Sequence, residues 1–104
     1  MKQINLDEKS FSMVCDILKK NLKEKEIDAR TYIFGSRAKG NNRKFSDIDI
    51  AVKAEVNIPF SIMARLNFDF EESNLDYFVN LVDLNAASES FVKCIENDLI
   101  EFSY

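Results

Sequence analysis

A chain of 104 residues with a net charge of −4 and no histidine narrows the possible functions at once. Without histidine, zinc sites built on that residue, Ser-His-Asp and Cys-His catalysis, and a histidine general base are excluded. The balance of 14 basic against 18 acidic residues also argues against a strongly basic nucleic-acid-binding protein. Hydrophobic residues make up 46 % of the chain, enough for a modest core in one small domain over residues 1–104.

The first half of the chain contains a predicted helix, a strand and a short helical turn. Apolar residues recur at helical spacing over 11–22, and Asn5 or Asp7 can cap the start of this helix. Residues 30–34 are rich in β-branched and aromatic side chains, which is typical of a strand. Residues 36–39 are expected to form a helical turn directly after that strand.

The second half adds two strands and two helices. Residues 47–52 alternate between polar and apolar side chains and predict a strand. A helix over 59–70 begins with a proline and has an apolar face, and 77–84 predicts a third strand. A serine can cap the last helix, 88–102, where apolar residues again have helical spacing. This order predicts an α/β fold, a small mixed β-sheet with helices packed on it.

Cysteine usage and hydropathy indicate a cytoplasmic protein. Cys15 and Cys94 belong to no CxxC pair and lie among apolar neighbours, as expected of buried reduced thiols. No apolar run approaches the roughly 18 residues that a membrane-spanning helix requires. Residues 1–7 also lack the apolar core of a signal peptide. We therefore expect no membrane association.

Both glycines of the chain, Gly35 and Gly40, lie at the two ends of the predicted helical turn. At such a strand-to-helix junction, free backbone N–H groups and the Ser36 hydroxyl can bind a phosphate, and Gly35 has no side chain to obstruct it. Residues 29–46 contain basic but no acidic side chains, which favours a local anionic ligand on an acidic protein. A solvated charged loop is the alternative interpretation. The basic residues are Arg30, Arg37, Lys39, Arg43 and Lys44.

Asp47 and Asp49 follow this basic patch directly. In a strand, residues i and i+2 share a face, so the two carboxylates are expected side by side while Ile48, Ile50 and Val52 enter the core. An isolated Asp-x-Asp is more often a solvated strand edge. Two carboxylates this close repel each other unless a cation lies between them, and oxygen ligands suit Mg²⁺. Beside a phosphate-binding corner, they favour phosphoryl or nucleotidyl transfer.

The pattern Gly35-Ser36, ten residues, then Asp47-Ile48-Asp49 resembles that of the polymerase-β-like nucleotidyltransferases. The longer stretch GSRAKGNNRKFSDIDIAV is similar to the minimal nucleotidyltransferase (MNT) subfamily, small proteins usually paired with a HEPN-domain partner in toxin–antitoxin modules. The resemblance extends over nearly the whole chain in the order and length of its elements. It implies the polymerase-β-like nucleotidyltransferase fold.

The resemblance also implies roles for particular residues. Ser36, with Gly35, corresponds to the family's contact to the nucleoside triphosphate. Asp47 and Asp49 correspond to its metal-binding carboxylates, with Mg²⁺ the expected ion, so that these two and Ser36 are the predicted catalytic residues. Two basic residues match more loosely and are expected to assist in binding phosphate: Arg37 and Lys39.

The sequence departs from the family pattern at the third carboxylate. The family usually places this acid on the next strand in a Val-Asp-Leu setting, whereas this chain has Val79-Asn80-Leu81. Asp83 is nearby, but side chains three residues apart in a strand point to opposite faces of the sheet. Asn80 and Asp83 could therefore reach the same metal only if the strand contained a bulge. Three alternatives stay open: a site that works with Asn80, a different register that brings in Asp83, or weakened activity.

The function implied by the resemblance is transfer of AMP from ATP, or from another nucleoside triphosphate, to a tyrosine of a HEPN toxin, a ribonuclease that the modification silences. The alternative is a weakly catalytic or non-catalytic antitoxin that neutralises the toxin by binding it. Polymerases and tRNA-modifying relatives need added domains to grip a template, so we expect no direct binding of long nucleic acids. An accidental motif in a generic small α/β domain is a third alternative.

Nine phenylalanines and three tyrosines in so short a chain indicate an interface. Some of these residues fit core-facing positions: Phe11, Phe34, Phe70 and Phe91. Others fall partly off them: Phe45, Phe60, Phe68, Phe102 and Tyr104. Exposed aromatic residues that gather in a patch favour a hetero-oligomer, here with the HEPN partner, and a homodimer on the same surface is the alternative.

Overall fold

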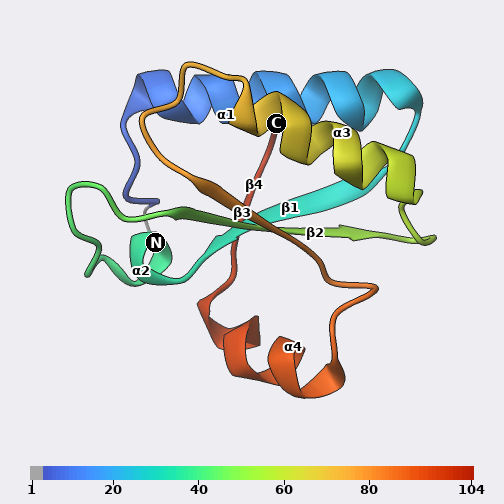
Figure 1. The fold of residues 1–104 in the computed structure, drawn as a ribbon. Helices are drawn as coiled ribbons and strands as arrows, with labels where there is room; N and C mark the ends of the chain where they lie inside the picture. Colours follow the sequence, from blue (N-terminus) through green and yellow to red (C-terminus); the bar gives the residue numbers. More distant parts are fainter. Residues whose placement is uncertain (1–3) are drawn as a thin grey trace.

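The computed structural model describes residues 4–104 as a four-stranded sheet with helices on both faces (Figure 1). Helices α1 and α3 cover one face, and α4 lies on the opposite face. In chain order the elements are α1 (Glu8–Asn21), a 3₁₀ turn (Lys23–Lys25), β1 (Ala29–Phe34), α2 (Ser36–Lys39), β2 (Ile48–Ala54), α3 (Phe60–Glu71), β3 (Val79–Asp83), α4 (Glu89–Ile95), a second 3₁₀ turn (Glu96–Asp98) and β4 (Ile100–Phe102).

The sheet is mixed, as the sequence predicts. Its strand order is β3-β2-β1-β4, in which β1 pairs antiparallel with both β2 and β4 while β2 and β3 run parallel. The register sets Asp49 of β2 opposite Phe34 at the end of β1 and opposite Asn80 of β3. Strand pairing therefore brings the end of β1 and the starts of β2 and β3 to one corner of the sheet.

The core lies between the sheet and the layer of α1 and α3. Of the two caps considered for α1, Asp7 occupies the N-cap position, and its carboxylate accepts a hydrogen bond from the Ser10 N–H at 3.0 Å. That hydrogen bond is the main reason why the pKa of Asp7 lies below its ordinary value. The apolar stripe of this helix faces the core, with Val14, Leu18 and Leu22 fully buried and Phe11 and Cys15 half-buried. Its residues and their partners include Val14, Leu18, Leu22, Ile33, Ile48, Ile50, Val52, Leu66 and Phe70.

The last predicted helix is wrong beyond Ile95. In place of a helix to residue 102, α4 ends at Ile95, and Ile100–Phe102 form β4 along the outer edge of β1. This pairing satisfies backbone groups of β1 that a helix could not reach, and the Thr31 hydroxyl adds a hydrogen bond to the Phe102 carbonyl at 2.9 Å. Apolar residues at helical spacing do not by themselves exclude a short strand, so tertiary pairing decided the outcome.

Truncating Phe102 tests this strand assignment. The ring is 9 % exposed and packs edge-to-face on Phe11, with centroids 5.5 Å apart. We expect Phe102→Ala to lower the free energy of unfolding by about 3 kcal/mol in urea denaturation. The control Phe60→Ala removes a ring that is 87 % exposed and should change it by less than about 0.5 kcal/mol. Equal small effects would contradict the packing of β4.

The set of aromatic side chains that are buried differs from the predicted set. Phe102, predicted off the core, is buried and Tyr104 is half-buried, whereas Phe91, predicted in the core, is 37 % exposed. Phe91 instead packs edge-to-face on Phe34 from α4, on the face of the sheet opposite the main core. Phe34 and Phe70 are buried as predicted. The exposed aromatic residues are Phe45, Phe60, Phe68, Phe78 and Phe91.

The two cysteines are free, but the prediction that both are buried is wrong. Cys15 is half-buried in α1, and Cys94 is exposed on α4. Since α4 covers the sheet with only part of its surface, an apolar neighbourhood in sequence does not imply burial here. Within residues 4–104, no helix has both the length and the apolar character that crossing a membrane demands.

Candidate nucleotidyltransferase site

The corner between β1 and α2 has a backbone that only glycine adopts easily. Gly35 has φ +74° and ψ −151°, a region essentially restricted to glycine. A Cβ atom at this position would also collide with the carboxylate of Asp49, far inside van der Waals contact. The Ala38 and Lys39 N–H groups donate to the Gly35 carbonyl, so the N–H groups that the turn leaves available to an anion are those of Ser36 and Arg37, beside the Ser36 hydroxyl. Gly35 thus allows the corner and Asp49 to come together.

Asp47 and Asp49 lie at the start of β2, beside this corner. Asp49 is half-buried, whereas Asp47 comes one residue before the strand and is exposed. The apolar residues between and after them, Ile48, Ile50 and Val52, are fully buried as predicted. Burial raises the pKa of Asp49 and the charge of Asp47 raises it further, while a hydrogen bond from Asn80 and the charge of Arg37 oppose them. Asp49 therefore lies against the corner at Gly35, and the Asp47 charge is near enough to raise the pKa of Asp49.

Asp47 and Asp49 offer carboxylate oxygens of the kind that a divalent cation binds. No cluster of three or more His, Cys, Asp or Glu side chains suited to a metal occurs among residues 4–104. A hard divalent cation binds carboxylate oxygens and takes further ligands from phosphate oxygens and water, so the donor set of Asp47 and Asp49 fits such an ion together with a nucleotide. The cation would also remove the repulsion that disfavours two ionised groups here.

The register of β3 places Asn80, not Asp83, next to Asp49. Asn80 is the direct neighbour of Asp49, and its Nδ2 donates to Asp49 Oδ1 at 3.3 Å. Strand β3 pairs with β2 without interruption from Val79 to Asp83, so Asp83 lies opposite Val52. There its carboxylate accepts a hydrogen bond from the Asn85 N–H at 2.9 Å. The bulge that would bring Asp83 to the metal is therefore not present in this part of the sheet.

The two predicted phosphate-assisting residues have different surroundings. Arg37 is buried, at 3 % exposure, and its guanidinium donates to the carbonyl oxygens of Asn5 and Ser46. Lys39 is on the surface, and its Nζ lies 3.5 Å from an Asp98 carboxylate oxygen. Lys39 keeps its ammonium at the surface, whereas three N–H groups of the Arg37 guanidinium are bound to backbone carbonyl oxygens. No local sequence pattern indicated that Arg37 is buried, because the groups that it contacts come from distant parts of the chain.

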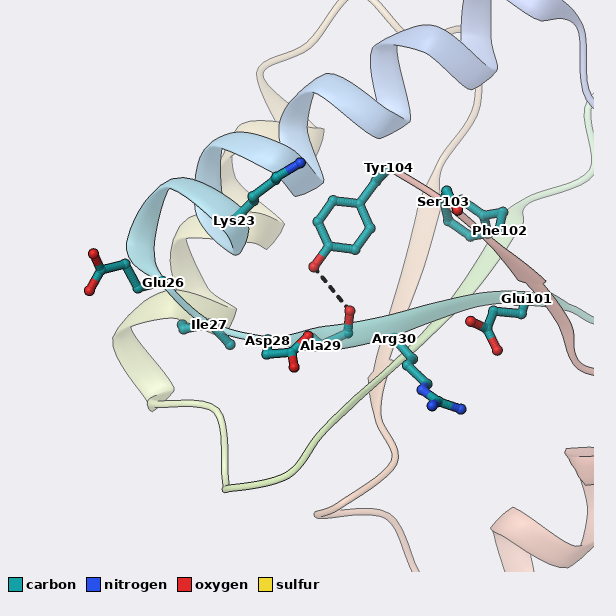
Figure 2. Close-up of a pocket in the computed structure, with 10 residues that line it drawn as sticks. All are labelled: Lys23, Glu26, Ile27, Asp28, Ala29, Arg30, Glu101, Phe102, Ser103 and Tyr104. Carbon is teal, nitrogen blue, oxygen red and sulfur yellow. Dashed lines mark hydrogen bonds between the residues drawn. The ribbon is translucent and has the colours of Figure 1, made fainter.

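A separate pocket of about 540 Å³ opens at the other end of β1 (Figure 2). Its wall includes the chain terminus, where the Tyr104 hydroxyl donates to the Ala29 carbonyl at 3.0 Å. The pocket is lined by side chains of both charge signs, such as Lys23, Asp28 and Glu101. None of the predicted site residues lines it, so the chemistry inferred from the sequence belongs to the corner at Gly35.

A glycine-serine turn facing an Asp-x-Asp strand on a mixed sheet defines a nucleotidyltransferase. Residues 16–101 match the family described as Polymerase beta, Nucleotidyltransferase, and the chain belongs to this family. It is 38 % identical over 90 residues to the probable protein adenylyltransferase MntA of Haemophilus influenzae, a match that covers 86 % of this chain and 77 % of that protein.

Solved toxin–antitoxin structures share this fold. The chain is 28 % identical to a chain of a toxin–antitoxin complex crystallised with AMP-PNP, with a TM-score of 0.70, covering 95 % of this chain and 75 % of that one. A complex of a tri-AMPylated HEPN toxin with an MNT antitoxin from Shewanella oneidensis contains a chain of the same fold, with a TM-score of 0.67 and 24 % identity over 95 % of this chain and 74 % of that one. The resemblance to minimal nucleotidyltransferases is thus confirmed.

Proposed function

We propose that this protein is a Mg²⁺-dependent adenylyltransferase that moves AMP from ATP to a tyrosine hydroxyl of a HEPN toxin and so acts as its antitoxin. The observation that carries the proposal is the convergence of Gly35, Ser36 and Asp49, packed so closely that no side chain fits on the glycine. The likeness to an adenylyltransferase over most of both chains supports AMP as the transferred group. Because ATP is a cytoplasmic substrate, we place the reaction in the cytoplasm.

The corner supplies the contacts that the reaction requires. The Ser36 hydroxyl and the N–H groups after Gly35 bind the triphosphate, with Lys39 as a mobile cation beside it. Asp47 and Asp49 would hold the ion, which would supply positive charge to offset that of the triphosphate and of the departing pyrophosphate. The tyrosine oxygen forms a bond to the α-phosphorus as the bond to the oxygen bridging the α- and β-phosphates breaks; pyrophosphate leaves, and the hydroxyl proton passes to solvent water. The protein's contribution is to orient the α-phosphate for that attack.

Exposed aromatic side chains beside the corner support a protein acceptor. Phe45 and Phe78 are 71 % and 82 % exposed, and both adjoin Asp47, since Phe45 is two residues before it and the Phe78 carbonyl accepts from the next N–H, that of Ile48, at 2.8 Å. Aromatic residues are enriched at protein interfaces. A partner that covers these rings would bring its tyrosine to the ion, and the resulting hetero-oligomer needs neither a membrane nor a long nucleic acid.

Co-expression with the product of the adjacent gene tests this proposal. Size-exclusion chromatography with light scattering should show a complex of the two proteins, and intact-mass analysis should show AMP on a tyrosine of the partner only when ATP and Mg²⁺ are supplied. A homodimer that does not co-elute with the partner would contradict the toxin–antitoxin pairing. A stable complex without any AMP adduct would instead support neutralisation by binding alone.

Asn80 favours this second candidate, an antitoxin with weak catalysis, and its replacement separates the two. If the missing third carboxylate limits catalysis, Asn80→Asp should raise the rate of AMP transfer by about tenfold, because a further anionic oxygen strengthens the metal site. Initial rates of AMP incorporation measure this. Asp83→Ala is the matched control and should leave the rate unchanged. An unaffected Asn80→Asp together with an inactive Asp83→Ala would show that Asp83 supplies the acid.

A further inference from the structure

Arg37 follows Ser36 in the sequence, yet its side chain turns away from the phosphate corner into the protein. It is 3 % exposed, and no carboxylate of residues 4–104 lies within ion-pair distance of it. A buried cation without an anionic partner is costly unless other groups solvate it. Here backbone carbonyl oxygens and an aromatic ring take that role, which points to a specific structural use of this guanidinium.

The contacts of Arg37 join segments that are distant in sequence. Its Nε and Nη2 donate to the Ser46 carbonyl at 3.2 and 2.8 Å, and its Nη1 donates to the Asn5 carbonyl at 2.7 Å. The backbone of Arg37 accepts a hydrogen bond from the Asn5 N–H at 3.0 Å. Its Cζ lies 4.4 Å from the centre of the Tyr77 ring, just before β3. One side chain thus connects the corner, the loop before β2 and the approach to β3.

These contacts determine where Asp47 lies. Its carboxylate has no hydrogen bond or ion pair with the described residues, so its position follows from the backbone on either side. On one side the Ser46 carbonyl is held by Arg37, and on the other the Ile48 N–H is held by the Phe78 carbonyl at 2.8 Å. Because Arg37 follows Ser36 and Ser46 precedes Asp47, the hydrogen bonds from Arg37 to the Ser46 carbonyl link the backbone at Ser36 to the backbone at Asp47.

We propose that Arg37 is a positioning residue that fixes Asp47 relative to Ser36, so that the triphosphate and its ion meet in one arrangement. This inference rests on the proposed function. An arginine suits the task because its planar fork donates two hydrogen bonds to one carbonyl and a third to another while its face stacks on a ring, whereas lysine offers a single ammonium. In this proposal Arg37 acts on the site through the Ser46 backbone, whereas the role expected from the sequence was direct assistance in binding phosphate.

Arg37→Lys and Arg37→Met test this inference, with Arg65→Lys as the matched control. Arg65 also stacks on an aromatic ring, with its Cζ 5.6 Å from the centre of Phe68, but from the exposed side of α3. Hydrogen exchange should become faster in residues 41–48 of both Arg37 variants, while β1 keeps its protection. The kcat of AMP transfer should fall about a hundredfold with an unchanged KM for ATP, and the Mg²⁺ concentration for half-maximal rate should rise.

These measurements distinguish failure of the inference about Arg37 from failure of the proposed function. A raised KM for ATP with an unchanged kcat would show that Arg37 binds the triphosphate, and unchanged exchange in residues 41–48 would show that it does not hold the loop; either result overturns the inference. If both Arg37 variants unfold, Tyr77→Leu decides, since it removes the stacked ring alone and should lower kcat in the same direction. If the wild-type protein and Arg65→Lys transfer no AMP, the proposed function fails, while the exchange result still decides whether Arg37 fixes the loop.

Discussion

Replacing Asp47 and Asp49 together by asparagine is expected to abolish detectable binding of ATP with Mg²⁺ and to lower AMP transfer about a thousandfold. The loss corresponds to roughly 4 kcal/mol, the scale of charge stabilisation that a bound metal ion provides in a transition state. Titration calorimetry measures the binding, and AMP incorporation into the partner measures the rate. The fold should persist, because burial and the charge of Asp47 already disfavour the ionised form of Asp49.

The matched control is Asp28→Asn/Asp76→Asn. This variant also removes two negative charges, but from exposed positions outside the corner, so it reports any effect of net charge alone. Calorimetry and transfer should match those of the wild-type protein. If the Asp47/Asp49 variant bound ATP and Mg²⁺ as tightly as this control, the two carboxylates would not be the metal site.

Gly35→Ala is expected to abolish AMP transfer and to lower the free energy of unfolding by about 3 kcal/mol. The methyl group would collide with the Asp49 carboxylate, and the backbone conformation of Gly35 is one that alanine adopts only with strain. The protein must therefore displace either the corner or Asp49. Urea denaturation and initial rates of transfer measure the two effects.

Gly40→Ala is a close control for this variant. Gly40 has φ +79°, similar to Gly35, but a Cβ there would meet only the Asn5 side chain at 3.7 Å, an ordinary contact. We expect a destabilisation of about 1 kcal/mol and nearly unchanged transfer. If Gly40→Ala impaired transfer as severely as Gly35→Ala, backbone strain rather than the approach of Asp49 would explain the loss.

The sequence predicted those parts of the fold whose signals are local. The stripe of α1, the turn between the two glycines and the alternation of β2 each depend on residues close together in the chain, and the structure confirms them. Strand β4 could not be predicted in this way, because its formation depends on the free edge of β1, far away in sequence. Local periodicity describes which residues are apolar, whereas the free edge of β1 decides that Ile100–Phe102 form a strand.

The residues of the candidate site also differ in whether local sequence signals predicted their positions. Gly35, Ser36, Asp47 and Asp49 were found from their spacing, and the structure brings Gly35 and Asp49 into direct contact. The position of Asn80 beside Asp49 required a register that periodicity alone left open between two alternatives. The burial of Arg37 could not be seen at all, since its partners Ser46, Asn5 and Tyr77 contribute two backbone carbonyl oxygens and a ring face rather than a recognisable charged group.

The antiparallel pairing of β1 with β2 also has a consequence for how the site is assembled during folding. Gly35 and Asp49 are joined by a short connection, so their contact closes early and at a low entropic cost. Asn80 reaches Asp49 only after the chain has crossed over through α3 to form a parallel pair, a slower and longer-range event. The contact of Gly35 with Asp49 thus belongs to the β1–β2 pair, whereas the position of Asn80 beside Asp49 requires the completed sheet. Under the proposed function, we expect substitutions at Asn80 in β3 to change the rate of transfer while the Gly35–Asp49 contact is kept.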